Sequence, residues 1–72
     1  MSRHPDPERI HQARRDAVRN TLADTGMPLE KAERWCDAWE AEAERRGLPR
    51  GRDYWIVGAA WIEAERAARR SP

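Results

Sequence analysis

Two short segments rich in glycine and proline divide this 72-residue chain into three parts. They are residues 25–28 (TGMP) and residues 47–51 (GLPRG). Glycine and proline interrupt helices, and on both sides of each interruption apolar residues recur every three or four positions. No stretch shows the alternation of a half-buried strand. The sequence therefore predicts an all-α fold, a compact three-helix bundle with helices at about 7–24, 28–46 and 53–70.

Local sequence patterns mark the ends of these helices. Asp6 is suited to cap the first helix, with Pro7 at the first helical position, and Gly26 is suited to end it. Gly47 predicts a Schellman-type end for the second helix, and Asp53 is the expected N-cap of the third.

The chain is long enough for one small domain. We expect residues 1–6 to form a disordered tail and residues 7–70 to form a single three-helix domain. A domain of this size buries only about 60% of the surface that its unfolded chain exposes. Four tryptophans and Tyr54 supply the largest apolar side chains, so the predicted core is rich in tryptophan.

The third segment opens with residues 54–62 (YWIVGAAWI), which are nonpolar at every position. A helix in a bundle buries one side, so this run predicts apolar surface that its thinner neighbours leave uncovered. We expect homodimerisation through this helix, with Gly58 and Ala59 at the crossing, or docking on a larger protein. The alternative is that all four tryptophans pack inside one monomer. The candidate core or interface residues are Trp35, Trp39, Tyr54, Trp55, Gly58, Ala59, Trp61 and Ile62.

The alternative function is a small nucleic-acid-binding regulator that contacts phosphates through arginine. The formal net charge is only +1, but residues 50–72 carry five arginines against three acids. The apolar run 54–62 offers almost no donors for base edges, so contacts would be to the backbone. The candidate phosphate contacts are Arg50, Arg52, Arg66, Arg69 and Arg70.

Titratable residues elsewhere do not form a recognisable catalytic, cofactor or metal site, so we expect no enzyme activity. His4 and His11 have no neighbouring nucleophile in the sequence and are interpreted as solvated. Cys36 falls on an apolar helical stripe and is expected to be a small buried residue. A stripe of carboxylates on the second helix is expected to repel itself; its members are Glu30, Glu33, Asp37, Glu40 and Glu44.

The single cysteine and the polar start of the chain indicate the cellular compartment in which the protein is found. One cysteine cannot form an internal disulfide, and a secreted domain of this size normally needs several. The start has no signal-like apolar run, and the longest apolar stretch, 54–62, is shorter than the roughly 20 residues that span a bilayer. We therefore expect a cytoplasmic protein with no membrane passage.

One pattern of spaced residues is similar to a pattern in other short helical proteins. It consists of Trp35, Trp39-Glu40-Ala41-Glu42, Gly47-Leu48, Tyr54-Trp55, Gly58 and Trp61-Ile62. In this spacing the chain resembles short uncharacterised helical proteins of actinobacteria and their phages. The resemblance covers about two thirds of the chain and implies a mobile-element setting, in which a small protein regulates or adapts a larger one. It brings no activity or site with it.

Overall fold

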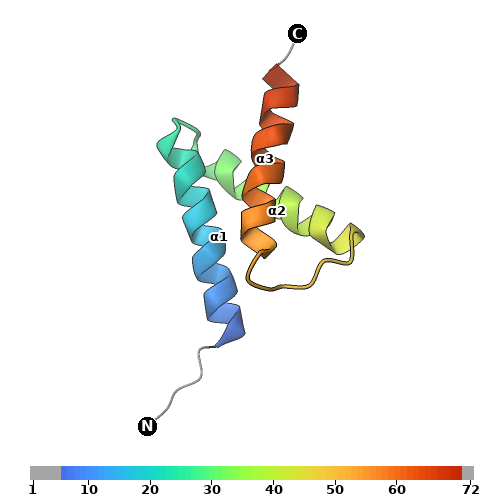
Figure 1. Ribbon diagram of the computed structural model, residues 1–72. Helices are drawn as coiled ribbons and strands as arrows, with labels where there is room; N and C mark the ends of the chain where they lie inside the picture. Colours follow the sequence, from blue (N-terminus) through green and yellow to red (C-terminus); the bar gives the residue numbers. More distant parts are fainter. Residues whose placement is uncertain (1–5, 71–72) are drawn as a thin grey trace.

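The computed structural model describes residues 6–70 and contains, over this range, three α-helices: α1 (Pro7–Asp24), α2 (Leu29–Arg45) and α3 (Tyr54–Arg70). Figure 1 shows α1 and α3 side by side and running in the same direction, with α2 crossing behind them. The predicted all-α bundle is confirmed, and every helix boundary lies within one residue of its predicted position. None of the helices in the described range is long and apolar enough to cross a membrane.

The start of α1 is capped as expected. The Asp6 carboxylate accepts a hydrogen bond of 3.0 Å from the backbone N–H of Glu8, and Pro7 occupies the first helical position. Gly26 follows the helix with a φ of 96°, a left-handed conformation that favours glycine. The predicted disordered tail, apart from Asp6, lies outside the described residues.

The other helix ends also follow from local chemistry. Gly47 has a φ of 66°, and the N–H of Leu48 donates to the carbonyl of Ala43 over 2.9 Å, which completes a Schellman motif at the end of α2. Asp53 directly precedes α3, and its carbonyl accepts from the N–H of Val57 over 2.9 Å. Gly47 therefore sets the end of α2, and α3 begins directly after Asp53, as the sequence predicts.

A chain of aromatic rings connects the helices at the centre of the core. Tyr54 lies 5.3 Å from Trp55 and 5.6 Å from Trp39, measured between ring centroids. Trp39 lies 5.8 Å from Trp61, which in turn lies 6.3 Å from Trp35. The buried apolar residues are Leu22, Ala32, Trp35, Cys36, Trp39, Ala43, Tyr54, Trp55 and Ile62. The predicted tryptophan-rich core is confirmed.

Candidate interaction surfaces

Most of the residues proposed as core or interface lie in the core of a single chain. Trp35, Trp39, Tyr54, Trp55, Gly58 and Ile62 are buried, Trp61 is half-buried, and Ala59 is exposed. The aromatic side chains therefore pack within the monomer. They offer little surface to a second molecule.

Gly58 faces Trp39 of its own chain and does not mark a crossing with another copy. A methyl group at position 58 would lie 2.5 Å from Cδ1 of Trp39 and closer still to Nε1. The indole ring is fully buried, and its Nε1 is without a hydrogen-bond partner among the described residues. The expected crossing at Gly58 is wrong, because the missing side chain makes room for an internal tryptophan.

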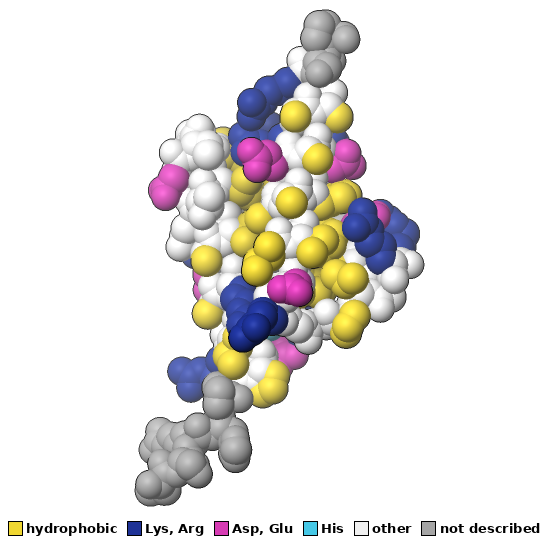
Figure 2. Space-filling view, in the orientation of Figure 1, with side chains coloured by type: hydrophobic (Ala, Val, Ile, Leu, Met, Phe, Trp, Pro, Cys, Tyr) yellow, Lys and Arg dark blue, Asp and Glu magenta, His cyan; other side chains and the backbone are white. Residues whose placement is uncertain are grey.

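The outward side of α3 is nevertheless apolar and uncovered. At 3.6 residues per turn, the residues opposite the buried Ile62 and Gly58 form one continuous stripe. Ile56 is 66% exposed and Val57 is 37% exposed. The apolar members of the stripe are Ile56, Val57, Ala60, Ala64, Ala67 and Ala68, all of them exposed, and the exposed Glu63 borders them. We call these six residues the α3 face; Figure 2 shows yellow side chains following α3 along its length.

The α3 face was only partly found by sequence reasoning. The expected uncovered surface on this helix is present, but none of the six residues of the α3 face was among the candidates. The candidates were mostly large aromatic residues, and these are the residues that the core of the monomer buries. The angular position of each residue relative to Gly58 and Ile62 could have identified the face.

A groove lies between the C-terminal parts of α1 and α3. Its volume is about 650 Å³, and its walls include Ala17, Val18 and Leu22 from α1 and Ala59 from α3. Thr21, Glu63, Arg66 and Arg70 are the polar residues along its length, together with Thr25 at its end. The lining also includes Ala67 of the α3 face, so the groove borders that face.

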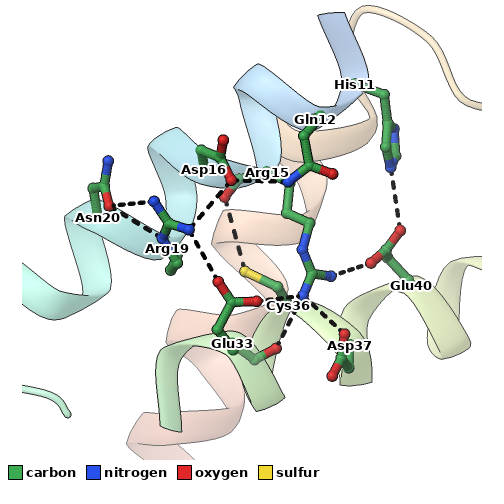
Figure 3. A network of polar contacts seen from close by, with 10 residues as sticks. All are labelled: His11, Gln12, Arg15, Asp16, Arg19, Asn20, Glu33, Cys36, Asp37 and Glu40. Carbon is green, nitrogen blue, oxygen red and sulfur yellow. Dashed lines mark hydrogen bonds and ion pairs between the residues drawn. The ribbon is translucent and has the colours of Figure 1, made fainter. Parts of the chain in front are cut away.

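Three carboxylates of the acidic stripe of α2, those of Glu33, Asp37 and Glu40, pair with cations of α1 (Figure 3). The guanidinium of Arg15 donates to Glu33 and Asp37 over 2.8 Å each, and it also pairs with Glu40. Arg19 reaches Glu33 over 3.1 Å. The expected self-repulsion of the stripe is therefore offset by cations from another helix.

Arg15 is the residue that holds this network together. Its side chain is only 11% exposed. Burial alone would lower its pKa, but the hydrogen bonds to Glu33 and Asp37 and the negative charge of Glu40 together outweigh burial and raise the pKa of the guanidinium. The hydrogen bonds that Glu33 accepts from Arg15 and from Arg19 lower the pKa of its carboxyl. Sequence reasoning missed Arg15, although His11, Arg15 and Arg19 recur every four residues on one side of α1.

His11 is buried, which corrects its interpretation as a solvated residue. Its Nε2 lies 3.2 Å from Oε2 of Glu40, and the indole N–H of Trp55 donates to its Nδ1 over 3.4 Å. Its ring is also 5.2 Å from that of Tyr54. Neutral His11 thus donates from Nε2 and accepts at Nδ1, which links all three helices. His4 lies outside the described residues.

Cys36 is buried, as predicted. Burial raises the pKa of its thiol to about 11, and the thiol points at the backbone carbonyl of Arg15, 3.9 Å away. A thiol of this kind is unreactive at neutral pH. Within residues 6–70, the histidine, cysteine and carboxylate side chains form no group of three that could hold a metal ion.

The five arginines proposed to contact phosphate are divided between the two ends of α3. Arg50 and Arg52 precede the helix, and Arg50 forms an ion pair of 2.6 Å with Glu8. Arg66, Arg69 and Arg70 lie in the last turns. Arg69 is stacked over the Trp35 ring at 5.0 Å, and Arg66 donates to the Thr25 hydroxyl over 3.5 Å. The structure does not bring the five into one site.

Comparison with known proteins adds no relative to this description. No protein-family model matches the chain, and no curated protein and no solved structure matches it. The resemblance to short actinobacterial and phage proteins therefore stays a prediction.

Proposed function

We propose that this protein is a small non-catalytic interaction module that forms a homodimer through the α3 face. The observation that carries the proposal is the exposure of two large aliphatic side chains, Ile56 at 66% and Val57 at 37%, in a stripe completed by alanine and bordered by the exposed Glu63. A continuous exposed apolar stripe is typical of a binding surface. Alanine allows a second helix to approach closely, since it adds little bulk.

The α3 face is complementary to itself in one arrangement. If two copies of α3 cross antiparallel at the level of Ile62, Ile56 lies opposite Ala68 of the second copy, and Val57 lies opposite Ala67. Ala60 then lies opposite Ala64. Each large side chain meets a small one, and the two helix dipoles oppose each other. A parallel pair would instead place Ile56 against Ile56 and alanine against alanine, which leaves gaps.

The size of the surface indicates a weak dimer. One helix on each side buries less than the roughly 1,200 Å² of a standard stable interface. We therefore expect dissociation in the micromolar range, which corresponds to about −8 kcal/mol or weaker. A dimer of this affinity responds to changes in protein concentration and is suited to a regulator or adaptor.

Sedimentation equilibrium at protein concentrations from roughly 10 µM to 1 mM tests the proposal. Wild type should shift from monomer towards dimer across this range. Ile56→Glu should remain monomeric, because it places a charge in the centre of the contact. The matched control is Leu29→Glu, since Leu29 is 54% exposed and lies in the first turn of α2.

Both substitutions add an acid to the first turn of a helix, where the dipole favours it, so neither should unfold the domain. Circular dichroism checks this. A wild type that stays monomeric at the highest concentration would overturn the proposed homodimer. Equal dissociation by Leu29→Glu would overturn the assignment to the α3 face.

The cytoplasm is the proposed location of the module. The single cysteine, Cys36, is buried beside the Arg15 carbonyl and makes no disulfide among the described residues. Small secreted domains usually depend on disulfides, whereas this core is assembled from tryptophan.

A further inference from the structure

A group of cations at one end of the molecule forms no ion pair within residues 6–70. Its members are Lys31 and Arg34 from α2, and Arg66, Arg69 and Arg70 from α3. We call them the cationic strip. By contrast, the arginines that do pair with carboxylates are Arg15, Arg19, Arg45, Arg46 and Arg50. The fold therefore leaves the cations of the strip without a carboxylate at ion-pairing distance among the described residues.

The cationic strip lines two adjoining hollows. One, of about 420 Å³, lies beside the α1–α2 turn and is bordered by Lys31, Arg66, Arg69 and Arg70. The other, of about 450 Å³, is bordered by Lys31, Arg34 and Arg69. Neither lining, as drawn from the described residues, includes a carboxylate. Because both hollows share Lys31 and Arg69, the positive surface is extended and suits several phosphates in a row.

The aromatic ring within the strip is not available for stacking. Trp35 is 8% exposed, and the Arg69 guanidinium covers it at 5.0 Å from the ring centroid. Proteins that hold single strands use open aromatic faces on which bases stack. Lys31 and Arg34 are exposed and carry only charge and N–H donors. The strip is thus equipped for a phosphate backbone and not for bases.

We propose that the cationic strip binds the phosphate backbone of duplex nucleic acid without reading its sequence. Five cations across two adjoining hollows match a polymer of phosphates better than one isolated anion. A membrane surface is less well matched. Peripheral membrane binding combines cations with a large exposed apolar anchor. Of the apolar residues that line the two hollows, only Pro28 is exposed, whereas Met27 and Ala38 are half-buried and Trp35 is buried. The inference does not rest on the α3 dimer, because none of the five cations belongs to the α3 face.

Fluorescence anisotropy with a labelled duplex of about 20 base pairs, titrated from about 50 to 200 mM NaCl, tests the proposal. Wild type should bind, and log K should fall with log salt with a slope no steeper than about −4.5, since each neutralised phosphate contributes about 0.9. The double variant Lys31→Gln/Arg34→Gln should bind about tenfold more weakly and lose about 1.8 from the slope. Both side chains are exposed, so the fold should be retained.

The matched control is Arg45→Gln/Arg46→Gln, which removes the same charge from the other end of α2, where both arginines pair with Glu42. It should bind within about twofold of wild type. An equal loss in both double variants would overturn the strip as the site, because it would reflect net charge alone. No binding at about 50 mM salt would also overturn the proposal.

Two further measurements distinguish nucleic acid from a lipid surface and test for sequence preference. Vesicles containing phosphatidylserine should bind more weakly than the duplex, and tighter binding to vesicles would overturn the nucleic-acid assignment in favour of a membrane. A second duplex of unrelated sequence should bind alike. A preference of more than about tenfold between the duplexes would contradict backbone-only recognition.

Discussion

The indole ring of Trp39 packs directly against the backbone of Gly58, at the point where α2 crosses α3. Any side chain at position 58 would enter the space of a fully buried ring.

Gly58→Ala should therefore lower the free energy of unfolding by about 1 to 3 kcal/mol. Alanine normally stabilises a helix interior by about 0.5 to 1 kcal/mol relative to glycine, so the sign of the effect is diagnostic. Gly51→Ala is the control, because nothing lies within 4 Å of the added methyl group. Urea denaturation measures both. A Gly58→Ala protein as stable as wild type would contradict the close contact.

Arg15→Gln should destabilise the domain by about 1 to 3 kcal/mol, because it leaves three carboxylates of α2 without their shared cation. Arg50→Gln removes a single exposed pair with Glu8 and should change stability by less than about 1 kcal/mol. Thermal or urea unfolding at neutral pH compares the two. Equal effects would show that the Arg15 network adds nothing beyond an ordinary surface pair.

Acid should weaken the folded state through Glu33. Its pKa is lowered in the folded protein by hydrogen bonds from Arg15 and Arg19, so its contribution to stability is complete above the unfolded value of about 4.3. That contribution is lost as the pH falls through the lower, folded pKa. Stability measured from pH 6 to about pH 2 should therefore decline. The decline should be shallower in Arg15→Gln, and an unchanged slope would argue against this linkage.

The Cys36 thiol should be protected from modification. Since its pKa is raised to about 11 by burial, reaction with a disulfide reagent at about pH 8 should be at least about a hundredfold slower in the native protein than in urea. The urea sample is the internal control. Rapid labelling of the native protein would mean that the α1–α2 contact around Cys36 opens readily.

Neutral His11 should be a single tautomer, with its proton on Nε2. Its Nδ1 accepts from the Trp55 indole, which can only donate, and Nε2 faces the Glu40 carboxylate. Long-range proton–nitrogen correlation spectra identify the protonated nitrogen. Trp55→Phe removes the donor and should allow the second tautomer to appear. A proton on Nδ1 in the wild type would contradict the hydrogen bond.

The helix boundaries were accessible from the sequence because their causes are local. Asp6, Gly26 and Gly47 act within one or two residues of the ends that they set. The burial of Cys36 likewise followed from helical spacing. The outward side of α3 was harder, because the run 54–62 contains no charged residue to mark which side meets solvent.

The polar contacts between helices could not be predicted in the same way. His11 meets Glu40, 29 residues later, and Trp55, 44 residues later. Such contacts depend on the crossing geometry of the helices, which caps and spacing do not specify.

The uneven composition of the core has a consequence for how the molecule opens. Only His11 and Leu22 are buried on α1, whereas α2 and α3 supply the aromatic rings. Guanidinium contacts from Arg15 and Arg19 also join α1 to α2. An element with few buried apolar side chains has low local stability, so the amides of α1 should exchange with solvent before those of α2 and α3. Local opening of the first helix would uncover Trp55, whose ring packs against His11.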